Sequence, residues 1–140
     1  MLEVIRASLE DSKAILQCAR DAYEDDEHSS EDDVQHDIEH NNYYKIVLDD
    51  IIIGGVFIVE EDAQTVSIED FCIVPLHQNK GYGQLVLREL ERIHGDIKKW
   101  KLTTPVDSVR NQHLYEKHGY KRVKVDDYGG TLCIYYEKFV

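Results

Sequence analysis

Residues 78–83 read Gln-Asn-Lys-Gly-Tyr-Gly and separate two segments of different periodicity. The apolar run before them, which ends with residues 71–75 (FCIVP), is typical of a buried strand. After them, apolar residues recur at helical spacing as far as Ile93. A glycine loop between a strand and a helix points the first helical N–H groups outward together, and the helix dipole adds positive potential. The stretch therefore predicts a loop that holds phosphate, for a ligand with a pyrophosphate group.

The spacing of the glycines does not fit two common nucleotide-binding loops. A Rossmann fingerprint requires a third glycine at position 86, which is Val86 here. It also requires an acidic ribose ligand about twenty residues further on, where Trp100 and Lys101 stand. A Walker loop requires Gly-Lys followed by Ser or Thr, whereas Lys80 precedes its glycine. We therefore set both nucleotide interpretations aside.

A second motif lies about thirty residues further along, at residues 111–120 (NQHLYEKHGY). Taken alone, it predicts an amphipathic helix that Gly119 ends. Q-x-x-G-x-G at residues 78–83, followed by this Asn and Leu-Tyr-Glu-Lys-x-Gly-Tyr run, resembles the two motifs of the GNAT family of N-acetyltransferases. The order of the motifs and the strand pattern match that family over nearly the whole chain.

The resemblance implies acetyl-coenzyme A as co-substrate and no metal. It places the pantetheine arm along the backbone of residues 71–73 and the pyrophosphate on the N–H groups of residues 78–84. Lys80 and Arg88 are expected to meet the adenosine phosphates. The cofactor-binding residues implied in this way are Phe71, Cys72, Ile73, Gln78, Asn79, Lys80, Gly81, Tyr82, Gly83, Gln84 and Asn111.

The same resemblance places Tyr115 beside the sulfur, where its hydroxyl would protonate the departing thiolate. Glu69 and Asp70 are the candidates for the base that takes the proton of the amine; strand alternation would put them on opposite faces, and we prefer Glu69. Many family members place the Asn seven residues before the Tyr, where this chain has Ser108, whereas Asn111 lies four before it. The implied reaction is acetyl transfer to a primary amine through a ternary complex.

Other roles for individual residues stay open at this stage. Cys72 could carry the acyl group, although a Cys in an apolar strand more often packs as a small core residue. The exposed histidines of the second motif are expected to be idle. His36-Asp37-Ile38-Glu39-His40 matches the H-x-x-E-H zinc pattern, but chance matches are easy in so acidic a stretch. A non-catalytic module that senses acyl-coenzyme A is the alternative to an enzyme.

Charge is divided unevenly along the chain of 140 residues, whose formal net charge is −12. Residues 1–70 contain 4 Lys and Arg against 20 Asp and Glu, and residues 71–140 contain 12 against 8. Such an acidic chain argues against a nucleic-acid partner. The basic half suits an anionic cofactor. The acidic half, densest at residues 21–40, favours a cationic acceptor, a small molecule or a peptide end, unless it only aids solubility; residues 24–27 would test this.

Length and composition indicate one N-acetyltransferase domain over residues 1–140. Apolar runs stay well short of the roughly 20 residues of a membrane span, and a signal peptide is not expected. The cysteines at positions 18, 72 and 133 are typical of reduced thiols in a cytoplasmic protein. Exposed strands and the tyrosines Tyr128, Tyr135 and Tyr136 would permit a homodimer.

The element order predicts an α/β fold with a mixed, mostly antiparallel sheet and about four flanking helices. Strands 65–74 and 99–103 should be parallel because a helix separates them, and the resemblance implies that they splay apart to admit the cofactor. The other expected strands are residues 2–7, 43–48, 51–59, 120–125 and 131–139. The expected helices are residues 9–24, about 30–40 with Ser29 or Ser30 as cap, 82–93 and 108–118.

Overall fold

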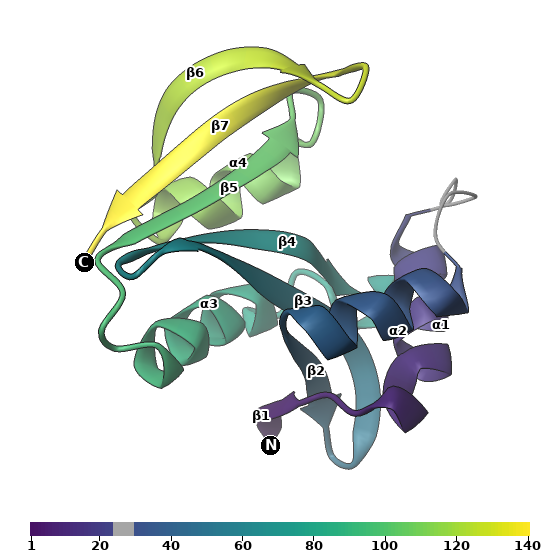
Figure 1. The fold of residues 1–140 in the computed structure, drawn as a ribbon. Helices are drawn as coiled ribbons and strands as arrows, with labels where there is room; N and C mark the ends of the chain where they lie inside the picture. The colour runs from purple at the N-terminus through teal and green to yellow at the C-terminus, as the bar shows by residue number, and fades with distance from the viewer. Residues whose placement is uncertain (24–29) are drawn as a thin grey trace.

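The computed structural model describes residues 1–23 and 30–140. Seven strands form one sheet in the order β1-β2-β3-β4-β5-β7-β6 (Figure 1). Every neighbouring pair is antiparallel except β4 and β5, so the predicted mixed sheet is confirmed. The strands are β1 (Leu2–Arg6), β2 (Asn42–Leu48), β3 (Ile51–Asp62), β4 (Thr65–Ile73), β5 (Lys99–Pro105), β6 (Lys121–Tyr128) and β7 (Thr131–Phe139).

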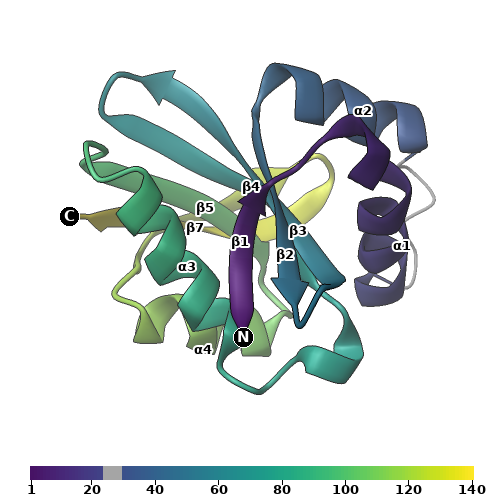
Figure 2. The same ribbon diagram turned by 90° about the horizontal axis from the view of Figure 1, so that it is seen from below.

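Helices cover both faces of the sheet. Figure 2 shows α1 and α2 on one side of the strands and α3 and α4 on the other. A core cluster lies on each side: one includes Ile15 of α1 and Phe57 of β3, and the larger one includes Leu90 of α3 and Tyr115 of α4. The α-helices of the described chain are α1 (Ser12–Ala22), α2 (Glu31–His40), α3 (Tyr82–Ile93) and α4 (Val109–Lys117); short 3-10 turns cover Leu9–Asp11 and Pro75–His77.

The ends of the first helix differ from the predicted ends, whereas α2 has its predicted bounds. The first helical segment begins with the 3-10 turn and α1 stops at Ala22, two residues before the expected end, which lies outside the described residues. Ser30 caps α2, because its hydroxyl accepts a hydrogen bond from the Asp33 N–H at 3.2 Å and its own N–H donates to the Asp33 carboxylate at 3.1 Å. This reciprocal capping box identifies Ser30 as the N-cap of α2. The alternative cap, Ser29, lies outside the described residues.

Two hairpin turns show how local chemistry sets strand ends. Asp49 and Asp50 both have positive φ, 48° and 69°, as the tight β2–β3 turn requires. Gly129 and Gly130, at 60° and 92°, make an equally short turn between β6 and β7. The expected five-residue loop over residues 126–130 is therefore wrong, because two glycines are sufficient to reverse the chain.

β4 and β5 are hydrogen-bonded neighbours only at their beginnings. The parallel register joins Thr65 to Lys99, Val66 to Trp100 and Ser67 to Lys101, and it ends there. β5 then stays paired with β7 through Pro105, so the two halves of the sheet separate, as Figure 1 shows. The predicted splay is confirmed, and the rest of β4, residues 68–73, is left with one open edge.

A bulge interrupts β4 along this open edge. Gly55 pairs with Cys72 and Phe57 with Glu69, so one residue of β3 opposes two residues of β4, Asp70 and Phe71. Asp70 has a φ of 45°, which is the left-handed conformation often found at such an extra residue. The regular alternation that we expected between Glu69 and Asp70 therefore does not hold across this position.

Candidate active site

A cavity of about 580 Å³ lies beside the open edge of β4, within the usual size range of a small-molecule site. The end of α1, the end of β4, the glycine loop and α4 all contribute to its wall. The predicted site residues that line it are Phe71, Cys72, Ile73, Gln78, Asn79, Gly81, Gly83, Gln84, Asn111 and Tyr115. Lys80, Tyr82, Glu69 and Asp70, also predicted, are not part of the lining.

The two glycines of the loop serve different purposes. Gly81 precedes α3 with a φ of 84°, a conformation that glycine adopts without steric cost. Gly83 allows close packing, because a Cβ there would lie 2.9 Å from Cδ2 of Leu114 on α4. The first helical hydrogen bond runs from the Leu85 N–H to the Gly81 carbonyl, so the N–H groups of residues 82–84 have no acceptor within α3 and suit an anion.

Gln78 is held by two hydrogen bonds of its own. Its backbone N–H donates to the Pro75 carbonyl at 3.2 Å, and its side-chain Nε2 donates to the Ile73 carbonyl at 2.7 Å. The Gln78 N–H was expected among the amides that hold the pyrophosphate, but in this structure the 3-10 turn uses it. Its side chain instead fastens the glycine loop to the end of β4.

The backbone of Phe71 and Ile73 faces the splay. The Val74 N–H donates to the Ile53 carbonyl at 2.9 Å, and Cys72 pairs with Gly55, so the backbone polar groups of Cys72 and Val74 point toward β3. Alternation turns the N–H and carbonyl groups of Phe71 and Ile73 the other way. That is the edge along which the resemblance implies pairing with a pantetheine arm.

Tyr115 reaches the cavity from α4 and is only 6% exposed. The rings of Tyr120 and Tyr136 lie edge-on against it, with centroids 6.1 and 6.0 Å away, which fixes its position. Burial raises the pKa of the Tyr115 hydroxyl well above its usual value. The phenol is therefore protonated at any physiological pH, as a proton donor must be.

Asn111 lies one helical turn before Tyr115 and also lines the cavity. Its Nδ2 donates to Oγ1 of Thr104 at 3.3 Å, and Thr104, at the end of β5, is 2% exposed. This contact ties α4 to the strand on the far side of the splay. Ser108 stands at the start of α4 without a side-chain capping bond.

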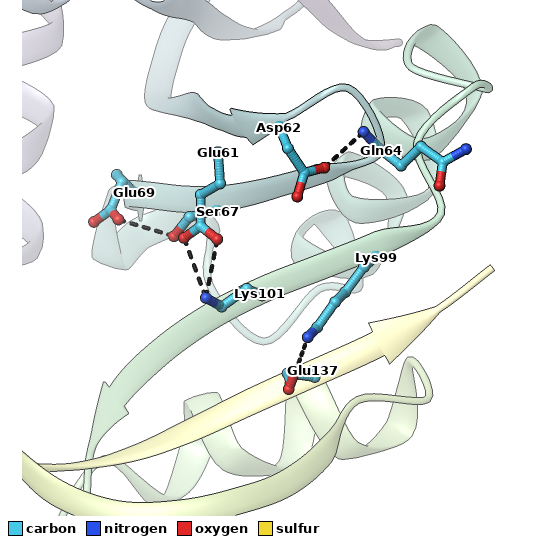
Figure 3. Close-up of polar contacts among 8 residues, drawn as sticks. All are labelled: Glu61, Asp62, Gln64, Ser67, Glu69, Lys99, Lys101 and Glu137. Atoms are coloured by element: carbon cyan, nitrogen blue, oxygen red, sulfur yellow. Dashed lines mark hydrogen bonds and ion pairs between the residues drawn. The ribbon is translucent and has the colours of Figure 1, made fainter.

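Glu69 is half-buried on β4, in a row of polar side chains where β4 and β5 part (Figure 3). Its carboxylate accepts a hydrogen bond from Oγ of Ser67 at 2.9 Å. Burial raises the pKa of Glu69, and the charges of Glu61 and Asp37 raise it further, while the Ser67 hydrogen bond opposes them. Lys101 of β5 holds Glu61 by an ion pair of 3.0 Å. Such a carboxylate has the pKa shift of a general base.

More acidic groups surround this side of β4. Burial is the main cause of the raised pKa of Asp37 on α2, and Asp70 is exposed at the bulge. The charge of Glu69 is the largest cause of the raised pKa of Tyr128, so the β6–β7 turn faces the same carboxylate. Residues 24–27, the acidic group named for a charge test, lie outside the described residues.

Several side chains of the site have no counterpart in the predicted set. Arg110, His113 and Lys117 all line the cavity, and their spacing of three and four on α4, shared by Leu114, marks one helix face that sequence periodicity could have found. His113 was expected to be idle. Tyr23, at the end of α1, lines the cavity too, and no local pattern marks it.

His118 was expected to be exposed, and this is wrong. Its side chain is 6% exposed and contacts Glu91 of α3, which also forms an ion pair of 2.9 Å with Lys138 of β7. Tyr136, expected on the surface, is 1% exposed and donates a hydrogen bond to Glu116. Both residues belong to the packing beneath the site.

The two histidines of the H-x-x-E-H pattern lie on α2 and contact each other. The rings of His36 and His40 stack with centroids 4.1 Å apart, and Nδ1 of His40 is 2.8 Å from the His36 carbonyl oxygen. Over residues 1–23 and 30–140, no group of three or more His, Cys, Asp or Glu side chains is placed to hold a metal ion. The same ranges contain no helix both long and apolar enough to cross a membrane.

Comparison with known proteins identifies the family. The sequence model of the acetyltransferase (GNAT) family matches residues 12–120, whereas no curated protein sequence matches significantly. The PaiA N-acetyltransferase of Thermoplasma acidophilum, solved with coenzyme A, has a TM-score of 0.84 at 18% identity, over 100% of this chain and 99% of that chain. A GNAT acetyltransferase of Streptococcus pneumoniae has a TM-score of 0.79 at 17% identity, over 100% and 99%.

The aminoglycoside acetyltransferase AAC(6')-Ib, solved with coenzyme A and kanamycin, has a TM-score of 0.80 at 16% identity, over 99% of this chain and 95% of that chain. At such identities these likenesses concern the fold alone. The family match rests on the sequence itself and spans more than half of the chain. This protein therefore belongs to the GNAT family of acetyltransferases.

Proposed function

We propose that this protein moves an acetyl group from acetyl-coenzyme A to a primary amine by direct attack within a ternary complex. The observation that carries the proposal is one cavity whose wall combines the start of α3, the open edge of β4 and Tyr115. An anion site, a peptide-like edge and a buried phenol are the three features that a pyrophosphate, a pantetheine arm and a departing thiolate require.

The amine attacks only in its neutral form, and a free alkyl amine has a pKa of about 10. Glu69 takes its proton, directly or through a water molecule, because burial has raised the pKa of this carboxylate and with it the basicity. The C–N bond forms, and an outward N–H of Phe71 or Ile73 stabilises the oxyanion. The N–H of Cys72 points toward β3, so it cannot serve. The C–S bond then breaks, and Tyr115 gives its proton to the sulfur.

Acetyl-coenzyme A would lie with its pyrophosphate on the amides of residues 79–84 and its arm along residues 71–73. Asn111 would contact the arm, and Lys80 the adenosine phosphates. Arg110 and Lys117 add positive charge to the wall of the same cavity, which favours a ligand with several phosphate groups. Holding both reactants in one site lowers the barrier by several kcal/mol without a covalent intermediate on Cys72.

We further propose a cationic acceptor. The charges of Asp37 on α2 and Glu61 on β3 both act on Glu69, and a cationic amine would gain from the field of these carboxylates. A small polyamine, an amino sugar or a basic peptide end all have this chemistry. The three cysteines are buried and form no disulfide, consistent with a reducing cytoplasm, and a homodimer through the exposed strands completes the proposal.

The test combines calorimetry with an acceptor screen. Acetyl-coenzyme A is titrated into the protein, and released thiol is then followed with 1,4-diaminobutane, kanamycin, a lysine-terminated peptide and, as amines without net positive charge, glycine and glutamate. We expect heat on binding and thiol release that is fastest with the cationic amines. Absence of binding would refute the phosphate site. Tight binding without turnover of any amine would instead favour the sensor module.

A further inference from the structure

Tyr23 brings a second phenol to the cavity that Tyr115 lines. Tyr23 follows α1, which packs in the core cluster on one face of the sheet, whereas Tyr115 belongs to the cluster on the opposite face. The two phenols therefore approach the open edge of β4 from opposite sides of the sheet. One phenol already has a task in the proposed reaction, and the other has none.

The hydrogen bond of Tyr23 fixes the direction of its hydroxyl. Its Oη donates to the Phe71 carbonyl, 2.6 Å away, on the edge of β4 that faces the splay. A hydroxyl has one hydrogen and two acceptor lone pairs. Because the single hydrogen is engaged by Phe71, the oxygen of Tyr23 is left as a pure acceptor, and a carbonyl such as that of Phe71 has a second lone pair for another donor.

The surroundings place this oxygen near the reacting atoms. Tyr23 as a whole is 43% exposed, but burial raises the pKa of its hydroxyl, and the nearby Cys72, Tyr115 and Asp70 raise it further. The hydroxyl consequently stays protonated and cannot act as a base. It can only receive a hydrogen bond from a donor that enters the cavity.

A primary amine needs such an acceptor. The neutral amine uses its lone pair to form the C–N bond and carries two N–H bonds. One proton leaves to Glu69 while the C–S bond breaks and the thiolate takes the proton of Tyr115. The other N–H remains in the product amide, and it has no partner among the groups already assigned.

We propose that Tyr23 orients the acceptor, its phenol oxygen receiving the N–H that the amine retains. This inference rests on the proposed acetyl transfer. It makes Tyr23 a determinant of specificity for primary amines, because a secondary amine has one N–H in its neutral form and surrenders it to the base. A secondary amine therefore cannot use Tyr23.

The experiment compares 1,4-diaminobutane, butylamine and lysine amide with counterparts in which every amine carries one N-methyl group, in wild type and in Tyr23→Phe. We expect Tyr23→Phe to lower kcat/KM for the primary amines by about three- to tenfold, the effect of one hydrogen bond, and to leave the N-methyl amines within about twofold. The preference for primary amines then falls by the same factor. A merely structural Tyr23 would lower both classes equally, which would overturn the inference.

Tyr135→Phe is the matched control. Its hydroxyl also donates to a backbone carbonyl, that of Asp127, at 3.2 Å, but Tyr135 is not part of the cavity wall. It should leave the ratio between primary and N-methyl amines unchanged. Calorimetry then measures the affinity of Tyr23→Phe for acetyl-coenzyme A. A changed affinity for this cofactor, together with an unchanged ratio of kcat/KM between primary and N-methyl amines, would assign Tyr23 to cofactor binding and refute the inference. Failure of wild type to use any of the amines would refute the acetyl transfer itself.

Discussion

A Cβ atom on Gly54 would lie 2.1 Å from the carbonyl oxygen of Cys72. The bulge at Asp70 shifts the β3–β4 register, and β3 can follow it this closely only with glycine at position 54. Gly54→Ala must push β3 away from the end of β4. We expect it to lower the free energy of unfolding by about 1–3 kcal/mol, as overpacking does, and to weaken acetyl-coenzyme A binding, measured by urea unfolding and calorimetry.

Gly55→Ala is the neighbouring control. A Cβ atom at position 55 would contact side chains only, Cγ2 of Ile15 at 3.1 Å and the ring of Tyr43 at 3.2 Å. It would therefore point to the face of the sheet that α1 covers. Small shifts of these side chains relieve the contact. Equal effects of the two substitutions on cofactor affinity would contradict the link between Gly54 and the edge of β4.

Removal of the Tyr115 hydroxyl should slow the chemical step. Tyr115→Phe keeps the ring contacts with Tyr120 and Tyr136 and removes only the proton donor. We expect kcat to fall by about tenfold to hundredfold, the lower range of general acid catalysis, with the dissociation constant of acetyl-coenzyme A within about twofold of wild type. Thiol release under saturating cofactor measures the first quantity and calorimetry the second.

Tyr120→Phe provides the control for this substitution. The Tyr120 hydroxyl is buried and, within the described part of the chain, has no hydrogen-bond partner. Its removal should keep kcat near the wild-type value and leave stability equal or higher, because an unsatisfied polar group is lost. A loss of kcat as large as that of Tyr115→Phe would show that general disturbance of the tyrosine cluster explains both.

The raised pKa of Glu69 favours its role as a base but lowers the stability of the folded protein at neutral pH. In the folded protein the Glu69 carboxyl holds its proton more tightly than in the unfolded chain. Its contribution to the free energy of unfolding is therefore complete below the pKa of the unfolded state and is lost as pH rises through the pKa of the folded state. Glu69→Gln should therefore be more stable than wild type at pH 7 and lose this advantage at about pH 4. Urea unfolding at both pH values checks the sign, and thiol release should show a large loss of kcat.

Ser67→Ala tests how the Ser67 hydrogen bond affects the pKa of Glu69. The Ser67 hydroxyl donates to Glu69 at 2.9 Å and favours its ionised form. Without it, the acidic limb of the profile of kcat/KM against pH should move to higher pH, because the base titrates later. A profile that keeps its midpoint while its height falls would mean that Glu69 is not the base.

Local chemistry explains which parts of the site the sequence predicted. The glycine loop follows from neighbours in the chain, since the φ of Gly81 and the start of α3 depend on a few adjacent residues. The parallel pair follows from the helix between its strands. The proposed path of the cofactor along residues 71–73 comes only from the resemblance to a family.

Contacts between distant residues account for what the sequence did not predict. Tyr23 and Phe71 are 48 positions apart, and nothing in either local pattern indicates that they meet. The bulge at Asp70 results from how β3 and β4 fit together, not from a turn signal. The backbone N–H of Gln78, by contrast, left the predicted set of amides through a local contact, because the 3-10 turn binds it to the Pro75 carbonyl.

The charge of Asp37 tests whether the acidic side of β4 selects cations. Asp37 on α2 acts on Glu69 through its charge and is half-buried, so it is screened less than a surface residue. Asp37→Asn should lower kcat/KM for 1,4-diaminobutane about two- to fivefold and weaken its dependence on salt, while butylamine changes less because it carries one charge. Asp32→Asn removes the same charge from an exposed position of α2 and should do neither. If both variants reduce the two amines alike, the acidic segment serves solubility and the acceptor is chosen by other groups of the site.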